Sequence, residues 1–397
     1  MLRECLIVWV ICTSASAASY RFGAIWDGYK VHKNACINIQ ADHIDSVGAC
    51  TGAAVDLSRY TAIPGLIDVH THLTYVLENR VSQAGRSAAV VYLARDNARK
   101  TLETGVTTVR DLGAADYADI AMRDLINGGQ MTGPRMFVAG YGLQITRGRQ
   151  TSPGTADGAA EVLRIVRQQI GAGADWIKMY GSTGSGRDVS GFETFTFEEM
   201  KAAVDAAHAM GKRIAIHSYG PAGARDAVRA GADSLEHAAD MDDETIGEMV
   251  RRKTFYVPTI DHNRYYADNA KLLNYPAGAV DDLKGYIQRN LDTARKAFAA
   301  GVRFAMGSDA VYTMFGENTR ELGWFVKAGM TPEQALRTAT TNAAELLNMT
   351  GRVGALQAGC YADVVAVEGD PLDNVDVAIS KVRWVMKGGE VVVDRTK

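Results

Sequence analysis

The sequence predicts an α/β protein: a (β/α)8 TIM barrel with a small β-sandwich domain built from both chain ends. Two observations lead to this class. The middle of the chain alternates short apolar runs with amphipathic stretches, which is typical of parallel strands joined by helices. The two ends carry only short β-type runs and turns. A chain of 397 residues, 47% of them hydrophobic, can bury one large core and form a smaller appended domain.

Residues 1–18 have the pattern of a secretory signal peptide. Arg3 precedes the apolar residues 6–12, and small residues follow at 15–18. A buried first strand is the weaker alternative, because the apolar stretch ends in Ser and Ala rather than at a turn. The stretch is also shorter than the roughly 20 residues of a membrane-spanning helix. We therefore expect a periplasmic or secreted protein with no membrane span.

Residues 19–60 and 355–397 are predicted to be the two parts of the β-sandwich. Residues 37–47 have the pattern of a hairpin, and residues 364–367 and 391–393 have the pattern of strands. Two unrelated β appendages are the alternative to a single small domain.

The cysteines leave the disulfide question open. Cys36 and Cys50 flank the predicted hairpin, so an oxidising compartment could pair them, but the sequence does not fix the distance between them. Cys360 has no evident mate. Cys5 and Cys12 would be removed with the signal peptide.

Residues 61–354 are predicted to form the barrel, because eight apolar runs alternate with helical stretches. The runs are 66–70, 106–110, 136–140, 176–179, 214–217, 234–237, 255–259 and 302–306. Residues 197–210 illustrate the helices, with Thr196 as the expected N-cap and Gly211 as the expected stop. An open doubly wound sheet is the alternative, but no phosphate-binding glycine pattern follows the first run.

Side chains that could hold metal ions close the first, fourth, fifth, sixth and eighth runs. They are His70, His72, Lys178, His217, His237 and Asp309. In a parallel barrel the C-terminal strand ends meet at one face, so we expect these side chains to surround one pocket. Nitrogen and oxygen donors of this kind suit Zn²⁺. His262 follows the seventh run, and we expect it only to line the pocket.

Four segments together resemble one known family. They are residues 64–72 (PGLIDVHTH), 105–111 (GVTTVRD), 234–238 (SLEHA) and 359–365 (GCYADVV). The chain resembles the metal-dependent amidohydrolase superfamily over nearly its whole length. More closely, it is similar to the imidazolonepropionase-like peptidase branch, which includes Xaa-Pro and Arg/Lys carboxypeptidase-type enzymes and ochratoxin-hydrolysing amidases.

The resemblance implies a binuclear metal-dependent hydrolase. His70, His72 and Asp309 would hold one divalent ion, and His217 and His237 a second, both expected to be Zn²⁺. A lysine ammonium cannot bind metal, so Lys178 would react with CO₂ to give a carbamate that bridges the two ions, a reaction that desolvation favours. A metal-bridging hydroxide would attack the substrate carbonyl, with Asp309 as the catalytic acid-base residue. The alternative for Lys178 is an ion pair with a carboxylate.

The expected substrate is a small dipeptide or N-acyl amino acid with a free carboxylate, cleaved at its amide or peptide bond. Tyr219, Arg149 and Tyr180 are the candidate substrate-binding residues, because an arginine can hold a carboxylate through two parallel bonds. Residues 146–150 (TRGRQ) depart from the Thr-Gly-Gly-His pattern of similar enzymes. Residues 180–186 (YGSTGSG) also depart from the pattern, and this glycine-rich loop is predicted to be mobile over the pocket.

Two other functions stay open. A mononuclear deaminase or cyclic-amide hydrolase would use His70, His72, His217 and Asp309, but it would leave Lys178 without a role, and no glutamate follows His217 closely. A secreted metal-binding or small-molecule-binding protein would need no proton-transferring aspartate. The nearly balanced charge, with a net charge of −3, gives no reason to expect nucleic acid as a partner. We expect a homo-oligomer of unspecified subunit number.

Overall fold

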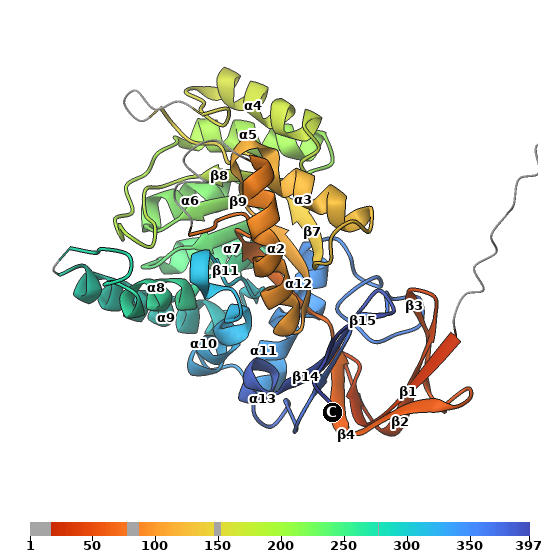
Figure 1. The fold of residues 1–397 in the computed structure, drawn as a ribbon. Coiled ribbons are helices and arrows are strands. Elements are labelled where there is room, and N and C mark those ends of the chain that lie inside the picture. Colours follow the sequence, from red (N-terminus) through yellow and green to blue (C-terminus); the bar gives the residue numbers. More distant parts are fainter. Residues whose placement is uncertain (1–16, 78–86, 147–151, 277) are drawn as a thin grey trace, which may run out of the picture.

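A computed structural model describes residues 17–77, 87–146, 152–276 and 278–397, and its strands fall into three sheets (Figure 1). Residues 1–16 of the predicted signal peptide lie outside the described residues. Ala17 and Ala18 already belong to the first strand, β1 (Ala17–Trp26). Within the described residues, no helix is both long enough and apolar enough to cross a membrane.

Strands from both chain ends form one seven-stranded sheet, in the order β15-β14-β13-β4-β1-β2-β3. Figure 1 shows these red and dark blue segments side by side, beside the rest of the molecule. The two ends meet where β13 runs antiparallel to β4. Besides β1 the strands are β2 (Val31–Gln40), β3 (His43–Gly48), β4 (Ala54–Pro64), β13 (Val364–Val367), β14 (Val382–Lys387) and β15 (Glu390–Asp394). The hydrogen-bonded pairing of these strands gives a single sheet. A sandwich of two facing sheets stays a prediction.

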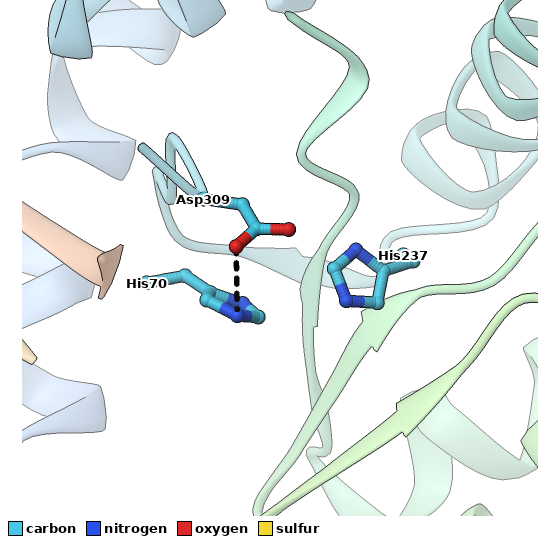
Figure 2. Close-up of side chains that lie close together, drawn as sticks. All are labelled: His70, His237 and Asp309. Atoms are coloured by element: carbon cyan, nitrogen blue, oxygen red, sulfur yellow. Dashed lines mark ion pairs between the residues drawn. The ribbon is translucent and has the colours of Figure 1, made fainter. Parts of the chain in front are cut away.

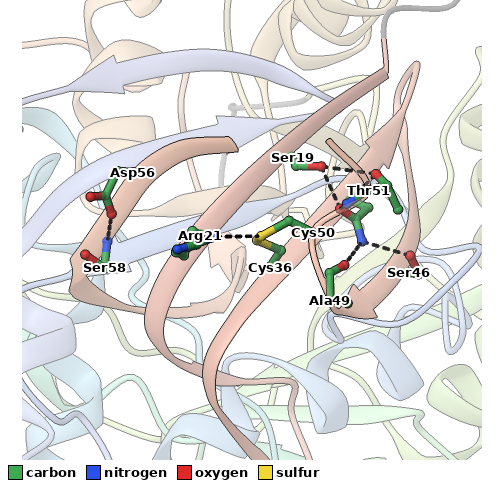
Figure 3. Close-up of a disulfide and its surroundings, with 10 residues drawn as sticks. Ser19, Arg21, Cys36, Ser46, Ala49, Cys50, Thr51, Asp56 and Ser58 are labelled. Atoms are coloured by element: carbon green, nitrogen blue, oxygen red, sulfur yellow. Dashed lines mark hydrogen bonds between the residues drawn. A yellow bond between two sulfur atoms is a disulfide. The ribbon is translucent and has the colours of Figure 1, made fainter. Parts of the chain in front are cut away.

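The predicted hairpin is present as β2 and β3, which pair with Ile37 opposite Val47, and a disulfide closes it. Cys36 on β2 is bonded to Cys50, which follows β3, with 5.1 Å between their Cα atoms (Figure 3). Beside it the buried Asn38 accepts a hydrogen bond from Ser19 and donates one to the carbonyl of Ala49. The pairing that the sequence left open is therefore present.

Eight further strands form two parallel sheets. One has the order β5-β6-β7 and the other β12-β11-β10-β9-β8. Their bounds are β5 (Leu66–Thr71), β6 (Val106–Asp111), β7 (Arg135–Val138), β8 (Trp176–Tyr180), β9 (Arg213–Ser218), β10 (Ser234–His237), β11 (Phe255–Val257) and β12 (Arg303–Phe304). Their residues are buried nearly throughout, as expected for parallel strands covered on both faces. Each predicted run overlaps one of these strands.

Three of these strands stop earlier than the sequence predicts. The runs expected to end at Gly140, Thr259 and Met306 end at Val138, Val257 and Phe304. Gly140 and Thr259 have φ angles of 65° and 49°, which extended strands do not contain. The apolar pattern continues past the point where the backbone turns.

Backbone hydrogen bonds also join the two parallel sheets at both of their edges. The amide of Val69 in β5 donates to the carbonyl of Met306, just beyond β12, at 2.9 Å. At the other edge, the amide of Leu143 donates to the carbonyl of Lys178 in β8 at 2.8 Å. These bonds connect β5 with the segment after β12, and β8 with the segment after β7.

Helices lie around the parallel strands, except the last one, which lies beside β14 of the seven-stranded sheet (Figure 1). They are α2 (Ser87–Glu103), α3 (Ala118–Asn127), α4 (Ala159–Gly171), α5 (Phe197–Ala209), α6 (Pro221–Ala230), α7 (Asp243–Arg252), α8 (Ile260–Asp268), α9 (Ala279–Ala299), α10 (Glu321–Lys327), α11 (Pro332–Thr338), α12 (Thr341–Leu346) and α13 (Asp376–Ser380). Helix α5 begins as predicted, because Thr196 and Glu199 form a capping box, and Gly211 follows its end with a φ of 68°.

A buried ion pair connects the two parallel sheets from inside. Arg110 on β6 and Glu236 on β10 are both fully buried, with 2.9 Å between guanidinium nitrogen and carboxylate oxygen. Arg110 also donates to the carbonyl of Val69 and to the hydroxyl of Ser234, and its guanidinium lies 4.4 Å from the ring centre of Trp176. One arginine thus contacts β5, β8 and β10 in addition to its own strand.

Removing the disulfide should lower the stability of the protein. The bond closes a loop with a sequence separation of 14 residues, and a loop of this size constrains the unfolded chain by about 3 kcal/mol. We expect the double variant Cys36→Ser/Cys50→Ser to lose about this much free energy of unfolding, measured by urea titration. Reductant should destabilise the wild type equally and leave the variant unchanged; an unaffected wild type would argue against the bond.

Neutralising Glu236 should destabilise the fold strongly. Glu236→Gln leaves the Arg110 guanidinium buried without its counter-charge, and breaking a buried pair in this way costs about 3–5 kcal/mol. The control is Glu333→Gln, which removes a partly exposed pair with Arg337 and should cost less than about 1 kcal/mol. Chemical unfolding of both variants measures the difference, and equal losses would contradict a structural role for the buried pair.

Candidate active site

The structure brings all six predicted ligand residues together around one cavity of about 270 Å³. The cavity lies at the C-terminal ends of the parallel strands. The six side chains come from β5 and the residue after it, from β8, β9 and β10, and from the segment after β12: His70, His72, Lys178, His217, His237 and Asp309. All six residues are buried.

His70, on β5, and His72, just after it, reach the same carboxylate. The Nε2 atoms of His70 and His72 lie 3.6 and 3.3 Å from Oδ1 of Asp309. The pairing of β5 with β6 shifts register between Asp68 and Thr71, which provides the bend that two alternating side chains need to converge. Figure 2 shows the Asp309 carboxylate above the His70 ring, with His237 to the right.

His217 and His237 form the other half of the cluster. Their ring centres are 4.5 Å apart. The Nδ1 atom of His237 lies 2.6 Å from the hydroxyl of Thr259, which fixes the ring and leaves Nε2 for a ligand. The Nε2 atom of His217 is buried and has no hydrogen-bond partner among the described residues. An unpaired buried nitrogen is costly, and a bound cation would satisfy it.

Lys178 is buried on β8, with 1% of its surface exposed. Burial lowers the pKa of its ammonium group to about 8, although the charges of Glu236 and Asp309 oppose this change. Among the described residues Lys178 forms no ion pair; Glu236 pairs with Arg110, and Asp309 pairs with histidines. Lys178 therefore loses its proton far more readily than an exposed lysine does.

Asp309 has a third histidine neighbour, His262 on α8. The Nε2 atom of His262 lies 3.2 Å from Oδ2 of Asp309, and its Nδ1 atom lies 2.7 Å from the Asp309 backbone carbonyl. Burial alone would raise the pKa of the Asp309 carboxyl, but His262, His70 and His72 hold it well below the usual range. The carboxylate is therefore ionised. His262 lines the cavity as expected, and its contact with Asp309 is an addition that the sequence did not predict.

Two residues that sequence reasoning passed over hold the histidines in place. Oε2 of Glu236 lies 2.7 Å from Nδ1 of His70, and the carbonyl of Gly113 lies 3.1 Å from Nδ1 of His72. These contacts direct both Nε2 atoms toward the cavity. Glu236 directly precedes His237 in the segment SLEHA. This position beside a predicted ligand was the sequence signal that could have marked it as part of the site. A backbone carbonyl such as that of Gly113 leaves no signal in a sequence.

The site has the electrostatics of a metal centre. Burial lowers the pKa of His70 to about 4 and places those of His217 and His237 well below the ordinary value. His72 differs, because burial would lower its pKa but the hydrogen bond and charge of Asp309 raise it. The neutral imidazoles of the other three histidines, beside an ionised carboxylate, are donors that suit divalent zinc. Ligand atoms of His70, His237 and Asp309 lie within 4.8 Å of one another. The residues present therefore fit a metal-binding site.

Two of the three predicted substrate-binding residues lie at the cavity. Tyr219 and Tyr180 line the cavity, and the ring of Tyr219 stacks on Tyr286 with centres 4.6 Å apart. Arg149 lies outside the described residues. Part of the glycine-rich loop, residues 184–186, lines the cavity together with Arg187. The mobility of this loop stays a prediction.

Comparison with known proteins connects this site to one family. The sequence pattern of the amidohydrolase family matches residues 61–392 of this chain. Ochratoxinase from Aspergillus niger is 31% identical over 368 residues, covering 83% of this chain and 75% of that protein. Imidazolonepropionase from Symbiobacterium thermophilum is 25% identical, covering 86% of this chain and 84% of its own. The crystal structure of a Xaa-Pro dipeptidase with bound methionine superimposes with a TM-score of 0.86 at 31% identity, covering 95% of this chain and 99% of that one.

These matches agree with the resemblance seen in the four sequence segments and with the branch that it indicated. The chain belongs to the amidohydrolase family, and it is a hydrolase that acts on carbon–nitrogen bonds.

Proposed function

We propose that this protein is a binuclear metal-dependent hydrolase that cleaves the amide or peptide bond of a small dipeptide or N-acyl amino acid with a free carboxylate. One observation carries the proposal: neutral imidazoles, an ionised carboxylate and a readily deprotonated buried lysine face one cavity. The printed names of similar proteins, ochratoxinase and Xaa-Pro dipeptidase, support an amide or dipeptide substrate.

Each proposed metal ion has its own ligands in this arrangement. His70, His72 and Asp309 would hold one divalent ion, proposed to be Zn²⁺, and His217 and His237 would hold the second. A carbamate formed from Lys178 and CO₂ would supply an oxygen to each ion. Ions bound there would supply Lewis acidity, which would make a water more acidic and an amide carbonyl more electrophilic.

The chain's own residues would handle the proton. The ionised Asp309 carboxylate accepts the proton that the attacking water releases and returns it to the leaving nitrogen of the amide. His262 holds Oδ2 of Asp309 and the backbone of the same residue, so the carboxylate keeps one orientation during this transfer. The three histidines around Asp309 are buried, which strengthens their electrostatic interaction with its carboxylate.

The same proposal includes the overall architecture and the location of the protein. A closed (β/α)8 barrel is supported by the hydrogen bonds that join β5 to the segment after β12 and β8 to Leu143. A β-sandwich made from both chain ends is supported by the shared seven-stranded sheet. Secretion or a periplasmic location is supported by the disulfide, because such bonds persist in oxidising compartments. Assembly as a homo-oligomer remains an expectation.

A mononuclear hydrolase is the second candidate, and one observation favours it. Among the described residues, the compact ligand group consists of His70, His237 and Asp309, which would suit a single ion. In that case Lys178 would not form a carbamate and would make no contribution to metal binding. The two candidates therefore differ in the number of ions per chain and in their dependence on this lysine.

Replacing Lys178 should separate the two candidates. Elemental analysis of wild-type protein prepared with Zn²⁺ and bicarbonate should give about two metal ions per chain. Lys178→Ala should hold fewer ions and lose hydrolysis of N-acyl amino acids by roughly 100-fold or more. Short carboxylic acids should restore part of the activity, because they can supply the bridging oxygens. The control is Lys201→Ala, an exposed lysine paired with Asp205; one ion in every variant would establish the mononuclear enzyme.

Reconstitution should depend on pH through the Lys178 amine. Only the neutral amine reacts with CO₂, and the pKa of this group is lowered from 10.5 to about 8. At constant dissolved CO₂, the reactivation rate of metal-free protein should rise about tenfold per pH unit below 8 and level off above it. Lys178→Glu should reactivate without CO₂ dependence. A rate that keeps rising toward pH 10 would show an ordinary lysine and contradict the expected chemistry.

A further inference from the structure

The cavity contains one positive side chain that the proposed mechanism does not use. Among the described residues that line it, Lys178 and Arg187 are the lysines and arginines. Carbamate formation would convert Lys178 into an anion. Arg187 would then be the one described lysine or arginine lining the cavity that keeps its positive charge.

Arg187 stands at the tip of a hairpin that follows β8. The amide of Thr183 donates to the carbonyl of Phe192 at 2.7 Å, and Ser182 pairs with Glu193. The amide of Ser185 donates to the carbonyl of Asp188 at 2.6 Å and closes the turn. These bonds place Arg187 inside a defined turn rather than in an unstructured loop.

The hairpin tip is attached to the segment that follows α8. Arg187 donates to the carbonyl of Leu273 at 3.2 Å, and its guanidinium lies 5.5 Å from the ring centre of Tyr275. The hydroxyl of Tyr275 donates to the carbonyl of Gly186 at 2.5 Å. A side chain at Gly186 would place its Cβ atom 2.1 Å from the ring of Tyr266, so only glycine permits this close approach. The guanidinium is thus held in position before any ligand arrives.

The geometry leaves Arg187 able to bind an anion. A guanidinium has five N–H donors, and the contact with Leu273 uses one of its nitrogens. Arg187 is itself exposed to solvent at the cavity mouth, whereas the ligand cluster is buried. The same cavity is also lined by aromatic rings: Tyr75, Tyr180, Tyr219, Tyr266 and Tyr312. Such a cavity suits a molecule with an amide at one end, an apolar body and an anion at the other end.

We propose that Arg187 binds the carboxylate of the substrate and thereby selects amides that carry a free carboxylate. The planar guanidinium can hold both carboxylate oxygens through parallel N–H···O bonds. This inference rests on the proposed function and names the residue that sets its substrate class. It assigns to Arg187 a role for which the sequence offered Arg149 as the arginine candidate.

Ligand binding tests the proposal without requiring turnover. Calorimetric titration of metal-loaded protein with 3-phenylpropanoate, a carboxylate that contains no amide bond, should give an affinity roughly 10- to 100-fold lower for Arg187→Gln than for the wild type. Arg187→Lys should have an intermediate affinity, because lysine keeps the positive charge but cannot bind both carboxylate oxygens through two parallel N–H bonds. The matched control is Arg289→Gln, since Arg289 also lies over a tyrosine ring, that of Tyr286, but does not line the cavity.

A kinetic comparison keeps this inference distinct from the proposed function. N-acetyl-L-phenylalanine and its carboxamide differ only in the carboxylate. In the wild type kcat/KM should favour the acid, and in Arg187→Gln the ratio should fall toward one, chiefly through a higher KM. Equal binding of 3-phenylpropanoate by wild type and Arg187→Gln, or binding by neither, would overturn the role of Arg187. Hydrolysis of neither amide by the wild type would instead overturn the proposed function, while the titration still decides the role of Arg187.

Discussion

The site depends on the buried ion pair between Arg110 and Glu236. Burying two charges is expensive, and hydrophobic residues of similar shape often give equal or greater stability, so a pair of this kind suggests a purpose other than stability. Here the second oxygen of Glu236 lies against Nδ1 of His70. Arg110 holds the pKa of Glu236 at about 2, against the effect of burial, so the carboxylate stays ionised and directs His70 Nε2 toward the cavity.

The remaining ligand positions depend on backbone that leaves the strand conformation. His237 and Asp309 have φ angles of 71° and 51°, values that non-glycine residues rarely adopt. Such positions persist where the surroundings enforce them, and they are frequent at functional sites. Around Asp309 that enforcement comes from Asp68, which accepts hydrogen bonds from the amide and hydroxyl of Ser308 and from the side chain of Asn318. The backbone beside Asp309 is thus fixed by a network centred on Asp68 of β5.

The sequence could predict the parallel strands and the residues at their ends because both leave local patterns. Each buried strand is a short apolar run, and a histidine, lysine or aspartate at its end is conspicuous. Contacts between distant segments leave no such pattern. The contact of His262 with Asp309 depends on how α8 leaves β11, and the partner of Glu236 lies on another sheet. The disulfide was left open because only the hairpin register fixes the distance between its cysteines.

The position of Arg187 also could not be predicted from local sequence, and this matters for function. In the sequence it follows a glycine-rich stretch and resembles any solvated loop arginine; its position becomes defined only through Tyr275 and Leu273, far along the chain. The ligand cluster stands on or beside strands inside the core, whereas Arg187 stands on a hairpin whose tip is held by a few polar contacts. Strands inside a packed core tolerate little change, and loops tolerate much more. Substrate preference can therefore change through the hairpin while the hydrolytic centre beneath it stays the same.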